Sequence, residues 1–391
     1  MIYSFGARNY FSFKDSFEVS FELNSKVPKA ISQGKKASNI LGIKGANASG
    51  KTNILKSLQF LSHFATRSFK SDPNQKITLS GFFLIDEPSD FYIDFEYNGI
   101  RYTYELTVNQ TEVIREAIYK KVARKTLILE RSRNTIKMRT TELAPLELVT
   151  LRSNASIIDT TAHYKMKNIG TDISNVHSFF SSFKGNVSSS TVISDTTLYD
   201  YNKISEFYKN NEDALNFAKR IICNSDLGIK DIIIHSRQTE SDETVYFPIF
   251  HHHIIDNADT EKDYKWLTYW DESDGTTALF RRLSQYWRVL NVGGVLIMDE
   301  FDTNYHPDLL PQILDLFLSN DSNPSNAQFI FTSHNLQIMD YLGKYRTYLT
   351  SKENGQSFCY RLDEIPGDII RNERSISALY RDGKLGGVPK I

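Results

Sequence analysis

Apolar and polar positions alternate near the start of the chain. One face of this pattern carries Phe11, Phe13, Phe17, Val19 and Phe21. A period of two is typical of β-strands that bury one side, so residues 1–45 predict antiparallel strands. The alternation ends in the apolar run Ile40–Ile43, which predicts a buried strand.

A second alternating region extends from Ile77 to about Arg139. Within it, the runs Phe91–Tyr97 and Ile100–Leu106 flank Asn98-Gly99, a dipeptide typical of a two-residue hairpin turn. Ile77–Leu84 is a further strand candidate. The whole region therefore predicts a meander of strands.

Apolar residues take a helical spacing between about residues 150 and 235. The spacing is carried by Ile204, Phe207, Tyr208, Leu215, Phe217, Ala218, Ile221 and Ile222. The Ser/Thr-rich stretch 188–197 predicts a loop within this region. From Asp271 onward, helix and strand patterns alternate, which favours a parallel sheet covered by helices.

The composition is that of a globular protein, with 40% hydrophobic and 24% charged residues in 391. With 46 Lys and Arg against 47 Asp and Glu, the formal charge is −1, which argues against a wholly basic nucleic-acid coat. The two cysteines, Cys223 and Cys359, provide no disulfide framework and fit a reducing compartment. Because no leader-like start or 18-residue apolar run is present, we expect a soluble cytoplasmic protein.

A complete phosphate-binding motif follows the first buried strand candidate. It consists of Gly45, Ala46, Asn47, Ala48, Ser49, Gly50, Lys51 and Thr52, and the helical run 53–60 follows it. The glycines allow backbone N–H groups to surround phosphates, and the helix N-terminus adds a favourable dipole. Lys51 is expected to reach the phosphates and Thr52 to bind Mg²⁺.

A second apolar strand candidate, Val295–Met298, ends in two carboxylates. Asp299 is expected to hold Mg²⁺ through water molecules, and Glu300 to polarise the attacking water. Lys51 and Asp299 are 248 positions apart (299 − 51), too far for a compact GTPase or kinase core without a large insertion.

The segment Glu272–Thr277 precedes an amphipathic helix just upstream of these carboxylates. Ser273 and Asp274 suit the cap of that helix, and Gly275 permits close approach of a phosphate. A plain helix cap is the alternative interpretation. Further along, the apolar strand candidate Phe329–Phe331 ends in a polar cluster that contains His334.

Together these motifs resemble an ABC-type ATPase of the SMC and RecF kind, with the motifs in the same order. The fuller likeness is to AAA-labelled ATPases of the AbiL/RloA kind, which are related to the ATPase half of OLD-family phage-defence proteins. The residues that carry it are 45–53, 272–276, 298–307, 332–335 and 380–389. Weaker likeness includes residues 9–15 and 227–229, so the resemblance covers nearly the whole chain.

The resemblance implies that ATP is clamped between the P-loop of one subunit and the signature of another. Ser273 and Gly275 would then act in trans in a homodimer or higher homo-oligomer, and His334 would be the switch histidine. Asn53 completes the implied ATP-binding set, and residues 301–307 would cross the dimer interface. The implied cofactors are ATP and Mg²⁺, and the implied catalytic residues are Lys51, Glu300 and His334.

The resulting prediction is an α/β, ABC-type P-loop ATPase with a mixed or parallel core sheet, an antiparallel β-rich subdomain and a helical lobe. Residues 1–145 and 286–391 would form the nucleotide-binding lobe, and 146–285 the helical lobe with the signature. Only 56 residues follow Asn335 (391 − 335), too few for an appended nuclease domain of OLD type. We therefore expect a sensor or scaffold ATPase that controls a separate nuclease or other toxin, with a nucleic acid or phage protein as trigger and no membrane partner.

Two other classes remain as alternatives. A RecF-like repair or recombination ATPase would bind DNA directly, whereas a transporter subunit is disfavoured by the long β-rich region after the P-loop. A basic stretch could serve DNA binding or be a solvated strand face: Lys120, Lys121, Arg124, Lys125, Arg131, Arg133, Lys137 and Arg139. His251-His252-His253 suits a hairpin surface better than a metal site, because no third ligand is evident.

ABC ATPases usually carry a glutamine between the two lobes that binds Mg²⁺. Gln59 falls within the helix after the P-loop, and Gln75 precedes the strand candidate Ile77–Leu84. Position alone favours Gln75 only weakly, so the sequence does not identify this ligand.

Overall fold

The fold is taken from a computed structural model of the chain, which describes residues 1–164, 170–188, 200–225, 228–255, 261–366, 370 and 375–387. Within these residues the strands form three sheets. The antiparallel sheet contains β1 (Ile2–Arg8), β2 (Phe17–Ser20), β4 (Ser89–Tyr97), β5 (Ile100–Val108), β6 (Val113–Lys121), β7 (Lys125–Ser132) and β8 (Thr135–Arg139). The core sheet contains β3 (Ile40–Gly45), β9 (Phe183–Gly185), β13 (Val295–Met298), β14 (Gln328–Thr332), β15 (Thr347–Glu353) and β16 (Gln356–Arg361). The distal sheet contains β10 (Ile229–Gln238), β11 (Thr244–Ile255) and β12 (Glu261–Thr268).

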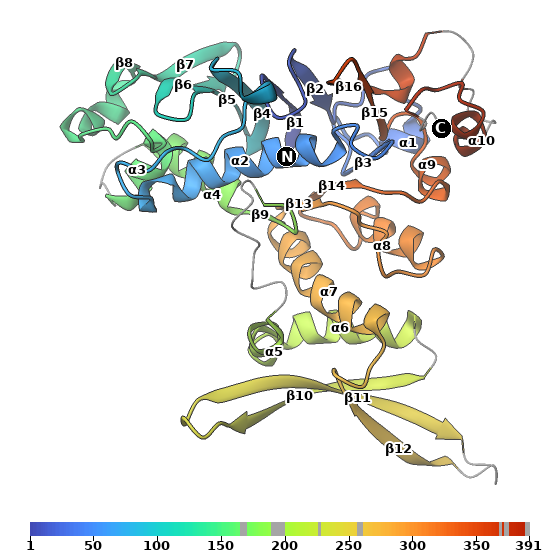
Figure 1. Cartoon of the computed structure of the whole chain (residues 1–391). Helices are drawn as coiled ribbons and strands as arrows, with labels where there is room; N and C mark the ends of the chain where they lie inside the picture. The colour runs from blue at the N-terminus through green and yellow to red at the C-terminus, as the bar shows by residue number, and fades with distance from the viewer. Residues whose placement is uncertain are drawn as a thin grey trace.

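Helices flank these sheets. They are α1 (Lys29–Ser32), α2 (Lys51–Arg67), α3 (Ile157–His163), α4 (Thr171–Ser181), α5 (Tyr201–Lys209), α6 (Glu212–Ser225), α7 (Asp274–Val292), α8 (Leu309–Leu318), α9 (Gln337–Leu342) and α10 (Ile376–Arg381). Figure 1 shows α2 running beneath the antiparallel sheet, and α7 leading from the distal lobe up to the core sheet. None of the helices within the described ranges is long and apolar enough to cross a membrane.

The antiparallel sheet has the order β2-β1-β4-β5-β6-β7-β8. The predicted hairpin at Asn98-Gly99 is confirmed, since Tyr97 pairs with Ile100. Both turn residues have positive φ, 51° at Asn98 and 73° at Gly99, as the tight hairpin turn requires. Alternate residues of β4, including Phe91, Ile93 and Phe95, are buried on one face, which explains the period of two in the sequence.

The strand predicted at Ile77–Leu84 is wrong. This segment has no strand pairing and ends in a 3₁₀ turn at Phe82–Leu84. Phe83 and Leu84 have φ values of 45° and 59°, and their side chains are 72% and 78% exposed. The apolar run is therefore not buried at its end, and the local backbone leaves the extended conformation that the pattern suggested.

The core sheet has the order β16-β15-β3-β14-β13-β9, and β16 is antiparallel to its neighbour β15. The pairs from β15 to β9 are all parallel. Successive residues of each strand point to opposite faces. In β13, for example, Val295 and Ile297 join the core under the antiparallel sheet, whereas Leu296 and Met298 join the core with α7 and α8. Burial on both faces accounts for the continuous apolar runs of these strands.

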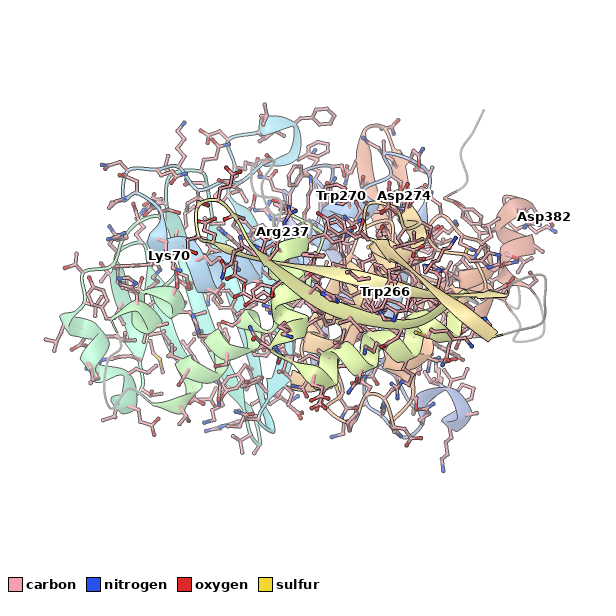
Figure 2. All side chains as sticks on the ribbon, turned by 90° about the horizontal axis from the view of Figure 1, so that it is seen from below. Lys70, Arg237, Trp266, Trp270, Asp274 and Asp382 are labelled. Carbon is pink, nitrogen blue, oxygen red and sulfur yellow. The ribbon has the colours of Figure 1, made fainter. Side chains whose placement is uncertain are left out.

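The predicted fold class is confirmed: an α/β chain with a mostly parallel core sheet, an antiparallel β-rich subdomain and a lobe that contains helices. The expected range 146–285 contains α5, α6 and the distal sheet, while β9 from the same range pairs with β13 in the core sheet. Figure 2, viewed from below, shows the distal sheet crossing the near face with Arg237 and Trp266 on it. The predicted loop at 188–197 lies outside the described residues after Ser188.

Candidate nucleotide site

The P-loop connects β3 to the start of α2, as the sequence predicted. Gly50 caps α2 with a φ of 108°, a conformation that side chains rarely adopt. A Cβ on Gly50 would lie 2.8 Å from Ser357 Oγ, and one on Gly45 would lie 2.4 Å from the Thr350 carbonyl oxygen. Both positions therefore require glycine, because β15 and β16 lie directly behind the loop and leave no room for a Cβ.

The Lys51 side chain lies over the loop. Its Nζ donates to the carbonyl oxygens of Gly45 and Ala46, both at 3.0 Å. Burial lowers the pKa of Lys51, while the carboxylate of Asp299 acts in the opposite direction. The ammonium group is thus held among the P-loop carbonyls and near the strand-end carboxylates, where it can meet a phosphate.

The carboxylate of Asp299 joins three parts of the fold. Thr52 Oγ1 donates to Asp299 Oδ2 at 2.8 Å, and Thr332 Oγ1 lies 2.5 Å from Asp299 Oδ1. Thr332 ends β14, so the P-loop helix, β13 and β14 meet at this carboxylate. Because parallel strands end at the same sheet edge, residues from distant parts of the sequence are brought together there.

Asn186 follows β9 and holds the backbone of Asp299. Its Nδ2 donates to the Asp299 carbonyl oxygen at 2.9 Å, and its Oδ1 accepts from the Asp299 N–H at 2.8 Å. The sequence contains no motif that predicts this contact. By contrast, Gln75 lies in a turn where its N–H donates to the Asp72 carbonyl oxygen.

Glu300 and His334 approach one another across the ends of β13 and β14. His334 Nε2 lies 4.0 Å from Glu300 Oε1, and the two side chains are 49% and 61% exposed. Glu300 has a φ of 49°, which is costly for a residue with a side chain, and its N–H donates to Thr332 Oγ1 at 2.8 Å. Backbone strain of this kind occurs where the fold fixes a functional side chain.

Two charged residues that sequence reasoning missed hold the backbone around His334. The carboxylate of Asp302 accepts the N–H groups of His334 at 3.0 Å and Asn335 at 2.9 Å. From the other side, Lys44 Nζ donates to the carbonyl oxygen of His334 and lies 3.5 Å from that of Ser333. Burial lowers the pKa of Lys44 to about 8, while Asp302 acts to raise it.

The signature segment forms the start of α7, as predicted. Ser273 is the N-cap and its Oγ accepts the Thr276 N–H at 3.2 Å. A Cβ on Gly275 would meet only Asn304 O at 3.4 Å and Ser273 Oγ at 3.9 Å, so the backbone here is approachable. Both residues line an open cavity of about 510 Å³ whose walls come from α6, α7, α8 and the loops that precede α7 and α8.

The basic stretch is largely paired within the antiparallel subdomain. Five of its members form ion pairs: Lys120–Asp172 at 2.9 Å, Lys125–Glu105 at 3.1 Å, Arg131–Glu116 at 2.9 Å, Arg133–Glu112 at 3.0 Å and Arg139–Glu147 at 2.9 Å. Arg131 and Glu116 are fully buried. These ion pairs engage the stretch within the subdomain, and the buried Arg131 does not belong to the solvated strand face that was one interpretation of the sequence.

The histidine triplet lies on β11. His252 Nε2 is 2.6 Å from Glu272 Oε2, next to the signature serine, and the His251 ring packs 3.3 Å from that of Trp266. In the described part of the chain, no three His, Cys, Asp or Glu side chains are grouped as a metal site would require.

The fold and the cluster at the strand ends define an ABC-type P-loop ATPase architecture. Residues 40–340 match the protein-family model described as "AAA domain, putative AbiEii toxin, Type IV TA system". That match covers 301 of 391 residues (340 − 40 + 1), and the chain belongs to this family.

Solved structures of similar shape include SMC head domains. The SMC head domain from Thermotoga maritima is 14% identical with a TM-score of 0.45, and the match covers 92% of this chain and 98% of that chain. The SMC head with an extended coiled coil bound to the C-terminal domain of ScpA, from Pyrococcus furiosus, is 12% identical with a TM-score of 0.45 and coverages of 93% and 97%. No curated protein matches the sequence.

Proposed function

We propose that this protein binds and hydrolyses ATP at a site shared between two copies of the chain. The P-loop residues 45–53 of one copy would hold the triphosphate, and the ammonium group of Lys51 would stabilise its negative charge. The observation that carries the proposal is the meeting of Thr52, Asp299 and Thr332 beside the P-loop, at 2.8 and 2.5 Å. A P-loop helix, a strand-end carboxylate and a polar strand end are the parts that phosphoryl transfer requires.

The side chains beside the P-loop fit Mg²⁺. The Thr52 hydroxyl and the Asp299 carboxylate are oxygen donors of the kind Mg²⁺ prefers, and the glycines leave a backbone cradle for phosphates. When bound, Mg²⁺ would neutralise phosphate charge. Glu300 would accept a proton from the attacking water, and His334 would form a hydrogen bond with the γ-phosphate.

The signature supports sharing of the site between two copies. Ser273 and Gly275 lie at the open N-terminus of a 19-residue helix, where backbone N–H groups favour anions. Their cavity is walled by α6, α7, α8 and the loops before α7 and α8, whereas Gly45 and Gly50 are backed by β15 and β16. In this arrangement the signature would complete the P-loop site of a partner copy.

The biological role that fits best is regulation of a separate toxic effector in phage defence. The family description names a toxin of a toxin–antitoxin system, and the motifs resemble those of AbiL/RloA and OLD-type ATPases. ATP binding would then couple the trigger, a nucleic acid or phage protein, to release or scaffolding of the effector. Such a protein would act in the cytoplasm.

A RecF-like ATPase that binds DNA directly receives less support. Five of the eight residues in its candidate basic stretch are engaged in ion pairs inside the subdomain. Arg131 is fully buried, and the other four paired residues would have to exchange a carboxylate partner for a phosphate, which reduces the electrostatic gain from displacing counterions. DNA binding that weakens steeply with salt and stimulates hydrolysis would reverse this preference.

The decisive experiment replaces the proposed base. Glu300→Gln should lower the hydrolysis rate by about a hundredfold or more, because general base catalysis contributes ~10²–10⁴-fold. The variant should also accumulate as an ATP-bound dimer, measured by light scattering during size-exclusion chromatography. Glu353→Gln, at the exposed end of β15, is the matched control and should behave as wild type.

Equal hydrolysis by Glu300→Gln and wild type would remove Glu300 from the mechanism. A wild-type protein that stays a single copy at saturating ATP and Mg²⁺ would contradict the shared site.

A further inference from the structure

The last described segment of the chain, Ser375–Gly387, packs beside the P-loop and the loop that carries His334. It contains α10, which lies beside α9 in Figure 1. Asp340 of α9 accepts from Ser377 Oγ at 2.6 Å and from Ser375 Oγ at 3.0 Å. The apolar side chains of Ser375–Gly387 form a small core with Leu349 of β15; they are Ile376, Leu379, Tyr380 and Leu385.

Two consecutive glycines bring this segment against the P-loop strand. Gly386 and Gly387 have φ values of 74° and 69°, which favour glycine. A Cβ on Gly387 would lie 3.2 Å from the Thr350 carbonyl oxygen and 3.8 Å from Gly45 Cα. The segment therefore reaches the first residue of the phosphate-binding motif.

Thr350 carries this contact into the P-loop itself. Its Oγ1 lies 2.5 Å from Ser49 Oγ and donates to the Lys44 carbonyl oxygen at 3.3 Å. Thr350 is fully buried, so a displacement of its backbone at Gly387 would also move the residues packed around it.

Tyr380 connects the same segment to the His334 loop. Its hydroxyl donates to the Gly387 carbonyl oxygen at 2.7 Å, and its ring centre lies 5.8 Å from Lys44 Nζ. Lys44 in turn donates to the carbonyl oxygen of His334. The segment thus contacts both the back of the P-loop and the lysine that holds the His334 loop.

We propose that Ser375–Gly387 is a positioning element of the nucleotide site, in which Gly387 and Tyr380 set the P-loop and the His334 loop relative to each other. This inference rests on the proposed ATP-binding function. It assigns a role to the C-terminal glycine motif, which contains no group that would react with ATP.

The test compares two glycine substitutions in the full-length protein. Gly387→Ala should raise the dissociation constant for a fluorescent ATP analogue with Mg²⁺ by about tenfold. The added Cβ, 3.2 Å from the Thr350 carbonyl oxygen, would displace the strand behind the P-loop, and loss of one hydrogen bond to a charged phosphate accounts for about that factor. Gly99→Ala, in the hairpin turn outside this segment, is the matched control: its φ is 73°, and no heavy atom lies within 4 Å of its added Cβ. Both variants carry similar backbone strain, so their melting temperatures should fall together while only Gly387→Ala loses affinity.

Tyr380→Phe provides a second variant if Gly387→Ala does not fold. It removes only the hydroxyl bond to Gly387 and should raise the KM for ATP about threefold, consistent with one buried hydrogen bond. Equal ATP affinity of Gly387→Ala and Gly99→Ala, or an equal KM of Tyr380→Phe and wild type, would overturn the inference and leave the proposed function standing. Failure of the wild type to bind the analogue would instead overturn both.

Discussion

The two halves of the proposed nucleotide site differ in how much of their geometry one chain fixes. On the P-loop side, Thr52, Asp299 and Thr332 are bonded to one another, and the loop glycines are packed against neighbouring strands. On the signature side, a Cβ on Gly275 would have two neighbours among the described residues, Asn304 O at 3.4 Å and Ser273 Oγ at 3.9 Å, and the cavity beside it is open.

This difference suggests which half of the proposed site would gain contacts when two copies associate. The P-loop half is organised before any nucleotide arrives, so it loses little entropy on binding. The signature half presents the N-terminus of α7, where the backbone N–H groups and the helix dipole favour an anion. In the proposed shared site, this division would couple nucleotide binding to the association of two copies.

The largest expected effect comes from removing the charge of the P-loop half. Lys51→Ala should weaken ATP binding by about a hundredfold, because hydrogen bonds to charged groups contribute up to ~3 kcal/mol. Isothermal titration with ATP and Mg²⁺ measures it. Lys56→Ala, on the same helix, removes an ammonium that lies 4.6 Å from the Phe11 ring and should bind ATP normally. Retained affinity in Lys51→Ala would place the nucleotide elsewhere.

A substitution in the signature half should have a smaller effect on function, seen as slower turnover. Ser273→Ala is expected to lower the ATPase rate by about tenfold, since one charge-assisted hydrogen bond contributes ~1.5 kcal/mol or more. The substitution also removes a helix cap, at a cost of ~1 kcal/mol in stability. Asp200→Ala controls for this, because Asp200 caps α5 in the same way, with its side chain accepting from Lys203 N. Unchanged turnover in Ser273→Ala would leave the serine as a cap alone.

Mixing the two damaged halves distinguishes sites within one chain from sites between chains. A mixed dimer of Lys51→Ala and Ser273→Ala chains has one site with both defects and one with neither. With random pairing, about a quarter of wild-type activity should return. Activity that stays at the average of the two separate variants would show that each chain completes its own site.

The sequence predicted the elements around the P-loop because their signals are local. The eight residues 45–52 lie together, and each flanking element has its own apolar pattern, which the fold reproduces in β3 and α2. The hairpin at Asn98-Gly99 was predictable for the same reason, since two residues with positive φ determine it. The start of α7 was also evident from Ser273.

The contacts that hold the site in place could not be predicted because they join residues far apart. Asn186 and Asp299 are 113 positions apart, and Lys44 reaches the His334 carbonyl across 290. Neither residue belongs to a motif, and only the strand order makes them neighbours. The error at Ile77–Leu84 has the opposite cause: a local apolar pattern suggested a strand that the left-handed backbone at Phe83 excludes.

Asn186→Ala tests whether the P-loop half depends on the backbone of Asp299. Losing both hydrogen bonds should displace the end of β13 and lower the hydrolysis rate about fivefold, which corresponds to ~1 kcal/mol in the activation free energy. Asn323→Ala is the matched control, because Asn323 clamps the backbone of Ala327 at 2.9 and 2.7 Å just before β14. Both variants should lose similar stability in urea unfolding. Equal activity of the two would make Asn186 a structural residue only.

The smallest expected effect is a pH dependence of stability at Lys44. Its folded-state pKa of about 8 lies below the value of ~10.4 in an unfolded chain. Between these values the unfolded chain binds more protons, so the contribution of Lys44 to the free energy of unfolding should rise with pH. Urea unfolding of wild type and Lys44→Gln at pH 7.5 and 9.5 measures this, and the wild type should gain on the variant at the higher pH. A constant difference would mean that the ammonium beside the His334 loop is not desolvated in the folded chain.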